Sequence, residues 1–268
     1  MQRFRLSLVM AVGLAVAVAV SLGATRASAG KGDRVVVEPG QKVQIAVSAS
    51  GEFGGGFAVG IGNAVAMAVA MHPTVSGFPV QLNTTVSPGC GVPEGEKVVA
   101  EGIVANTQNT GVIGPFCSSG ARYSLPVYEA AGVVVVSGSA SAVDLPPFAP
   151  TVFNRTVVEG PPGPPDPWFV TVTGLQSVKR WTDYHAAFPP AAPTSEFDAF
   201  SFDAATLLLD RLQQVSKIKD GNLVIDRKEL AKVVRRTTDF PGVTCTVAFD
   251  RATGNRLNDP ASLAGCAG

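Results

Sequence analysis

Five small hydroxyl side chains follow two short apolar runs near the middle of the chain. They are Ser118 and Ser119 after residues 112–113, and Ser137, Ser139 and Ser141 after residues 133–136. Hydroxyl groups next to the unpaired N–H groups that open a helix can hold an anion such as a carboxylate. This pattern favours binding of a small ligand. The alternative is that the serines only cap helices and turns.

Two buried parallel strands must position these serines. The runs Val112–Ile113 and Val133–Val136 predict such strands. The residues between them have helical spacing, with Tyr123, Val127 and Ala130 on one face. In an open parallel sheet, ligands bind just beyond the carboxyl ends of the strands. Both serine loops are therefore expected at the same edge of one sheet.

The rest of the first half continues the alternation of strands and helices. After a polar lead-in over residues 30–42, strands are expected at 43–47, 80–86 and 152–155, and helices at 57–71 and 94–106. Strands that alternate with helices predict an α/β fold. We expect a doubly wound parallel sheet with helices on both faces.

A proline-rich segment divides the chain. Residues 159–167 read EGPPGPPDP, which predicts a stiff linker or hinge. The sequence thus indicates a first lobe over residues 41–158 and a second part over residues 168–268. In the second part we expect helices at 178–188, 197–214 and 227–237, the last capped by Asp226, and a strand at 243–249.

The first 29 residues have the three regions of a secretory signal peptide. Arg3 and Arg5 precede an apolar run over residues 6–22, and Ala27-Ser28-Ala29 closes the segment. Cleavage after Ala29 would give a secreted or periplasmic protein without a lipid attachment cysteine. The alternative is a membrane anchor that stays uncleaved, because the run is nearly long enough to span a bilayer.

The charge balance of the chain argues against one class of partner, nucleic acid. The chain has 21 basic and 21 acidic residues, and removal of the leader with Arg3, Arg5 and Arg26 leaves 18 against 21. That balance gives no electrostatic basis for nucleic-acid binding.

The four cysteines of an exported chain predict disulfides, and pairing of sequence neighbours joins Cys90 to Cys117 and Cys245 to Cys266.

Motifs of catalysis and of cofactor binding are missing from the sequence. No G-x-S-x-G, Walker or H-E-x-x-H motif occurs, and the glycines before residue 57 do not form a dinucleotide fingerprint. Residues 219–230 resemble a calcium loop, but Ser216 and Arg227 stand where acidic ligands are needed. We therefore expect neither an enzyme nor a bound cofactor or metal.

The central stretch resembles the periplasmic binding proteins for branched-chain amino acids. Matching pieces occur in the family's order and spacing, and they continue in the tail. They are Ser50-Gly51, Cys90, residues 112–114 (VIG), 117–119 (CSS), 126–132 (PVYEAAG), 137–142, 153–156 (FNRT), 202–204 (FDA), 240–244 (FPGVT) and 249–250 (FD).

The resemblance implies a type I periplasmic-binding fold with a disulfide between the positions of Cys90 and Cys117. It also implies that the segment between residues 156 and 202 is too short for a full second lobe, since each strand–helix unit needs about thirty residues. Second-lobe contacts to the ligand have no visible counterpart here. We therefore expect a shortened second lobe.

By the same resemblance, the chain is expected to be the solute-binding protein of an ABC importer, with a membrane permease as partner. The ligand would be an amino acid or a similar small carboxylate. The implied ligand-binding residues are Ser118, Ser119, Ser139, Ala140, Ser141 and Phe57. The alternative function is a degenerate module without transport, a scaffold or sensor partner that keeps the fold but no ligand.

Overall fold

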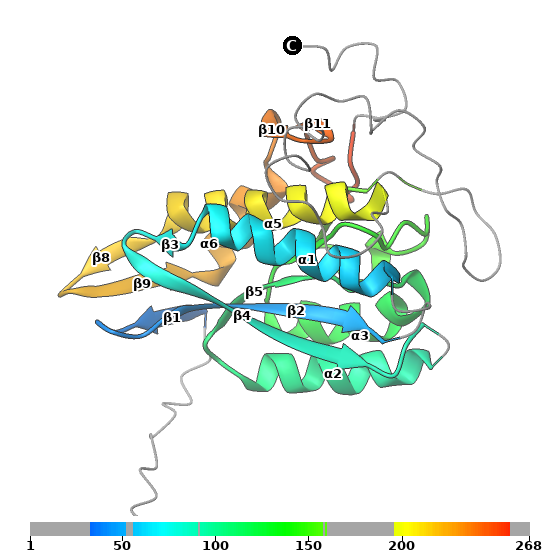
Figure 1. The fold of residues 1–268 in the computed structure, drawn as a ribbon, viewed down its shortest axis with the longest axis horizontal. Helices are drawn as coiled ribbons and strands as arrows, with labels where there is room; N and C mark the ends of the chain where they lie inside the picture. The colour runs from blue at the N-terminus through cyan, green and yellow to red at the C-terminus, as the bar shows by residue number, and fades with distance from the viewer. Residues whose placement is uncertain (1–32, 52–55, 91, 158, 160–195, 258–268) are drawn as a thin grey trace, which may run out of the picture. The chain divides into compact units, whose positions relative to one another are not determined.

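A mixed sheet of six strands forms the centre of the protein. The computed structural model describes residues 33–51, 56–90, 92–157, 159 and 196–257 (Figure 1). The strand order is β3-β4-β2-β5-β6-β7, in which β3 alone is antiparallel to its neighbour. The strands are β2 (Val43–Ser50), β3 (Thr74–Val75), β4 (Phe78–Ser87), β5 (Asn109–Ile113), β6 (Val135–Ser137) and β7 (Phe153–Arg155).

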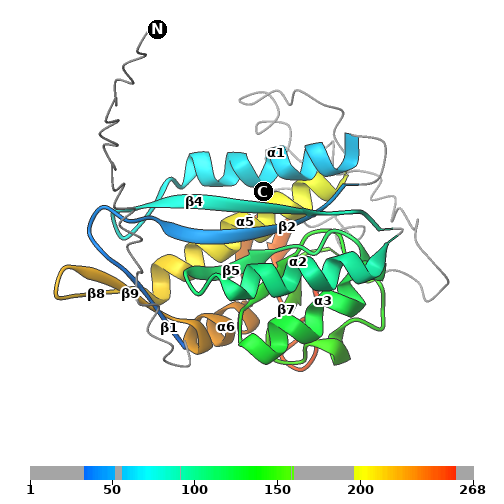
Figure 2. The same ribbon diagram turned by 90° about the horizontal axis from the view of Figure 1, so that it is seen from below.

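Helices cover both faces of this sheet, as the sequence predicted. Figures 1 and 2 show α1 (Gly56–Met71) and α5 (Glu196–Val215) on one face, and α2 (Pro93–Ala105) and α3 (Ser118–Ala131) on the other. Alternate residues of β2 pack against the two helix layers, because successive side chains of a strand point to opposite faces of the sheet. Ile45 packs with the α1–α5 layer, and Ala46 packs with the α2–α3 layer. The predicted doubly wound α/β architecture is confirmed.

The helix expected between the two strands is present as α3. Tyr123 is 40% exposed and Ala130 is exposed as well, so the face that carries them lies toward solvent. The buried face instead carries Ala121, Leu125 and Tyr128. Both sets have the spacing of one helical face, and periodicity alone does not say which of two such faces packs inward.

The lead-in before β2 contains a strand that the sequence did not suggest. β1 (Arg34–Val37) pairs antiparallel with β9 (Asn222–Asp226), which in turn pairs with β8 (Lys217–Lys219). Val35 and Val37 are buried in the core, while Arg34 and Val36 face outward. The Asp220-Gly221 turn of the β8–β9 hairpin, with φ of +52° and +79°, occupies the stretch that resembled a calcium loop.

Residues after 195 build onto the same core as the first part of the chain. Phe200, Leu207 and Leu208 of α5 belong to one hydrophobic cluster with Ile113 and Val136. Residues 196–257, which the sequence placed in a second part, thus lie in the same compact unit as β1–β7. The other elements here are α6 (Arg227–Arg235), β10 (Phe240–Gly242) and β11 (Cys245–Val247).

The cap predicted for α6 is confirmed, because the Asp226 side chain accepts a hydrogen bond from Glu229 N at 3.0 Å. Within the described residues, no helix is long and apolar enough to cross a membrane. The leader over residues 1–29, linker residues 160–167 and the expected helix at 178–188 lie outside the described residues.

Candidate ligand site at the carboxyl edge of the sheet

The two serine loops meet at the carboxyl ends of β5 and β6. These strands are parallel neighbours, with Val112 paired to Val135 and Ile113 to Val136, so the loops that follow them lie side by side. Ser118, the first residue of α3, joins them. Its Oγ accepts hydrogen bonds from the backbone N–H groups of Ser141 and Ala142, each at 3.1 Å.

The loop after β6 is held from within by its own serines. Ser137 Oγ donates to Pro115 O at 2.8 Å and accepts the N–H of Ala140 at 3.0 Å. Ser139 Oγ donates to Phe116 O at 2.8 Å. Ser139 and Ser141 are each only 6% exposed, and Ala140 is fully buried. The hydroxyls of Ser137 and Ser139 thus fix the loop on the segment before α3.

The other two expected ligand-binding residues lie differently. Ser119 is half-buried, and its Oγ donates to Cys90 O at 3.0 Å, toward the segment before α2. Phe57 lies in the first turn of α1, and its side chain is outside the described residues. The structure thus brings Ser118, Ser139, Ala140 and Ser141 together, with Ser119 next to them.

Two arginines hold this edge in place. Arg122 of α3 binds both carboxylate oxygens of Asp144, at 2.7 and 2.9 Å, and its Nη1 lies 3.3 Å from Ser118 O. Hydrogen bonding to Arg122 lowers the pKa of Asp144. Arg155 is fully buried and donates to Ala142 O at 2.7 Å, and burial lowers its pKa to about 10. Arg122 of α3 and Arg155 of β7 therefore hold the loop after β6 from two sides.

A buried carboxylate lies next to the serine edge, and sequence reasoning missed it. Glu96, in the first turn of α2, is fully buried, and its Oε1 accepts from Ser50 Oγ at 2.7 Å and from Ser87 Oγ. Ser48 Oγ lies 3.4 Å from Oε2. The signal in the sequence was weak: three serines at the ends of two strands, and an acid that looked like an ordinary first-turn residue.

The Cys90–Cys117 disulfide is confirmed and borders both polar groups. Its Cα atoms are 5.6 Å apart, and it joins the segment before α2 to the N-cap position of α3. Ser50 Oγ of the Glu96 group lies 3.3 Å from Cys117 Sγ. Cys245 is also disulfide-bonded. Its predicted partner Cys266 lies outside the described residues, so that pair stays a prediction.

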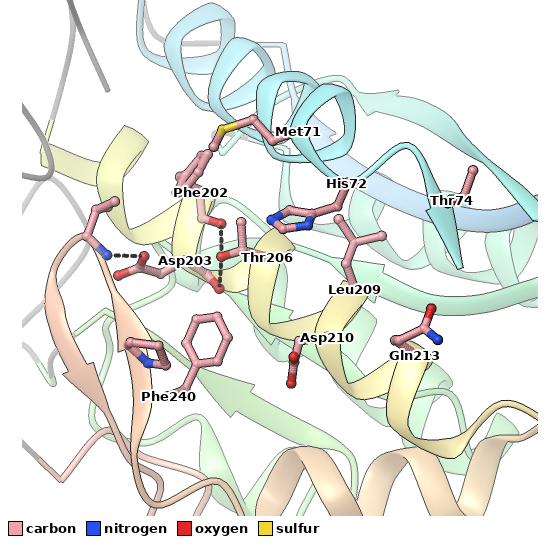
Figure 3. Close-up of a pocket in the computed structure, with 12 residues that line it drawn as sticks. Met71, His72, Thr74, Phe202, Asp203, Thr206, Leu209, Asp210, Gln213 and Phe240 are labelled. Carbon is pink, nitrogen blue, oxygen red and sulfur yellow. Dashed lines mark hydrogen bonds between the residues drawn. The ribbon is translucent and has the colours of Figure 1, made fainter. Parts of the chain in front are cut away.

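A pocket of about 380 Å³ lies elsewhere, between α1, α5 and β10 (Figure 3). Its walls include Met71, His72, Phe202 and Phe240. The Asp203 carboxylate at its side already accepts the N–H of Val243 at 2.7 Å. No residue of the serine loops lines this pocket.

Solved structures of solute-binding proteins resemble the described fold. The chain is similar to an ABC-type branched-chain amino acid transporter from Rhodopseudomonas palustris CGA009, at a TM-score of 0.60 and 13% identity over 81% of this chain and 90% of that one. The branched-chain amino acid binding protein LivJ from Streptococcus pneumoniae, in complex with isoleucine, gives 0.55 and 11% over 81% and 94%. A solute-binding protein from Rhodopseudomonas palustris BisB5, in complex with 3,4-dihydroxybenzoic acid, gives 0.58 and 13% over 81% and 92%.

The chain has the type I periplasmic-binding fold. No protein family model matches the sequence, and no curated protein does. The structural neighbours named above are transporter or solute-binding proteins. The expected fold is thus confirmed, while identities of 11–13% carry only the fold.

Proposed function

We propose that this chain is an extracytoplasmic solute-binding protein of an ABC-type importer. Its ligand is an amino acid or a similar small carboxylate, and its protein partner is a membrane permease. The predicted leader supports export. The absence of any catalytic motif from the sequence supports a binding role rather than an enzymatic one.

The observation that carries this proposal is the junction of Ser118 with the loop after β6. Ser118 opens α3, and the N-cap residue Cys117 makes no side-chain hydrogen bond to the first turn. The N–H groups that open a helix attract anions. A carboxylate placed here would lie at the carboxyl ends of β5 and β6, where ligands of open parallel sheets bind.

The neighbours' ligands agree with this chemistry. Isoleucine and 3,4-dihydroxybenzoic acid, bound in two of the similar structures, share a carboxylate. In our proposal Ser118 and Ser119 donate to that group, for which the Ser119 hydroxyl leaves Cys90 O, its acceptor in this structure. Ser139, Ala140 and Ser141 offer backbone and hydroxyl groups to the rest of the ligand. Phe57 would supply an apolar contact.

One observation favours the second candidate function, a non-transport module that keeps the fold without a ligand. Ser118 Oγ already accepts two backbone N–H groups, and Ser139 Oγ already donates to Phe116 O. Both residues are buried, at 3% and 6% exposure. A scaffold needs these bonds only for its own loop, whereas a binding protein must also offer donors to a ligand.

Calorimetric titration with a panel of amino acids and aromatic carboxylates separates the two functions. Binding is expected to raise the melting temperature, and Ser118→Ala should weaken it by about 1.5–3 kcal/mol, the range for a lost hydrogen bond to a charged group. Ser124→Ala is the matched control, because Ser124 is a buried serine of the same helix that bonds only to Gly120 O and Ala121 O. A flat response to every compound at millimolar concentration would favour the scaffold instead.

A further inference from the structure

Within the part of the chain that the structure describes, no strand covers one long edge of β4. β4 spans Phe78–Ser87 and pairs along Val80–Ser87 with β2 on one side. On its other side, β3 meets only Phe78 and Pro79 (Figure 1). Among the described residues, no strand pairs with Val80–Ser87 on that side.

The backbone groups of alternate residues point out of this edge. Val80 N donates to Pro73 O at 2.9 Å on the β3 side, whereas Ser87 O accepts from Gly51 N at 3.0 Å on the β2 side. Because the direction of these groups alternates along a strand, the N–H and C=O groups of Leu82, Thr84 and Val86 point outward like those of Val80. Thr84 is exposed, and Val86 is 58% exposed.

This edge lacks the features that normally prevent strands from pairing. Exposed edges usually carry charged residues, a proline or a bulge. Phe78–Ser87 contains no charged residue, and its single proline lies at the end that β3 covers. The β8 edge of the small sheet differs, because Lys217 and Lys219 flank the exposed Ile218.

The surface on the α1 side of the edge is also uncharged. α1 has no charged residue over Gly56–Met71, and its Val59 is 46% exposed. On the opposite face, Val98 of α2 is 68% exposed, and the charged residues Glu94, Lys97 and Glu101 of α2 are exposed as well. A second sheet could therefore approach on the α1 side without burying a charge, while Lys97 and Glu101 on the α2 side already pair with each other.

We propose that β4 pairs antiparallel with β4 of a second copy of this chain. With a two-fold axis at Thr84, Thr84 faces its own copy, and Leu82 faces Val86. The outward groups of these residues would then form the hydrogen-bonded pairs of one antiparallel ladder. About such a two-fold axis, each strand offers the same outward N–H and C=O groups to the other, so both strands can bond in this register without a shift.

The dimer would leave the candidate ligand site open. β4 lies near one end of the strand order, and the serine loops follow β5 and β6 toward the other end. The inference therefore does not depend on the proposed function. A failure to dimerise and a failure to bind carboxylates are measured separately.

Crosslinking through Thr84→Cys tests the geometry. Opposite residues in a hydrogen-bonded antiparallel pair have Cα atoms roughly 5.5 Å apart, which is within the range for a disulfide. Mild oxidation should convert most of this variant to a covalent dimer. Ala130→Cys, on the exposed face of α3, is the control and should stay largely monomeric. Equal crosslinking of both variants would overturn the proposed interface.

Sedimentation of the full chain tests the association itself. The unmodified protein should form dimers at high micromolar concentration. Thr84→Lys should raise the dimer dissociation constant by at least about tenfold, the equivalent of about 1.4 kcal/mol. Ala130→Lys should not change it, and unchanged melting temperatures would show that both variants fold. A monomer at every concentration, or a dimer indifferent to Thr84→Lys, would overturn the proposal.

Discussion

Arg122 and Asp144 form a two-pronged ion pair, with Nε 2.7 Å from Oδ2 and Nη2 2.9 Å from Oδ1. Arg122 lies four residues after Ser118 on α3, and Asp144 lies three residues after Ser141 on the neighbouring loop. The pair therefore ties together the two segments that meet at the candidate ligand site.

Asp144→Asn should remove a pH-dependent part of the stability. Arg122 holds the pKa of folded Asp144 below its ordinary value of 3.8. A lowered folded pKa stabilises the protein above the unfolded pKa, and this stabilisation is lost as the pH falls through the folded value. Since the Asp144 side chain is 49% exposed, we expect less than about 1 kcal/mol at neutral pH. Melting curves of both proteins should differ at pH 7 and converge below pH 3.8; a constant difference would contradict the assignment.

Glu96→Leu should destabilise the protein strongly. It leaves the buried hydroxyls of Ser50 and Ser87 without their acceptor, and each unsatisfied group costs about 1–3 kcal/mol. Urea unfolding measures the loss. The exposed Glu94, in the same helical turn, gives the control Glu94→Leu, which should change stability by less than about 0.5 kcal/mol. Equal effects of both substitutions would mean that the buried group does not stabilise the fold.

Gly138→Ala should loosen the contact between the serine loop and α5. A Cβ at Gly138 would lie 2.5 Å from the backbone Cα of Ser201, which cannot move as a side chain could. Overpacking of this kind costs about 1–3 kcal/mol. Gly102→Ala on α2 is the opposite case: its Cβ would meet nothing within 4 Å, and alanine in a helix is favoured by about 1 kcal/mol. The two variants should therefore shift the melting temperature in opposite directions.

The Cys90–Cys117 disulfide should stabilise the fold. Replacement of Cys90 and Cys117 by alanine should lower the free energy of unfolding by about 3.5 kcal/mol, given the loop that they close. Peptide mapping without reductant should recover Cys90–Cys117 and Cys245–Cys266 as separate pairs. Crossed pairs would contradict this pairing.

Much of the fold could be predicted because its strands are short apolar runs between helices. The strand at 43–47, the helix at 57–71 and the cap at Asp226 all follow from local pattern. β1 could not be predicted in this way, because Arg34–Val37 becomes a strand only through its partner β9, almost two hundred residues later. Pairing over that distance leaves no periodic trace in four residues.

The meeting of the two serine loops at one sheet edge was predictable, but their internal bonding was not. The order of strands placed Ser118 and Ser141 at one edge, as expected. That Ser118 accepts the Ser141 N–H depends on the exact approach of α3 to the neighbouring loop. Glu96 escaped notice for the same reason, because its serine partners Ser50 and Ser87 come from two strands that the sequence treats as separate.

Because α5 is synthesised long after β5 and β6, the core that they share can be completed only late in synthesis. The part of one sheet face at β5 and β6 is covered by α5, which begins only at Glu196. While the chain is synthesised from its N-terminus, α1 can cover its own part of this face, but the part at β5 and β6 stays bare until α5 has been made. Bare sheet faces are prone to aggregation. We expect the nascent chain to need a chaperone over this interval, and a version truncated before Glu196 to remain insoluble.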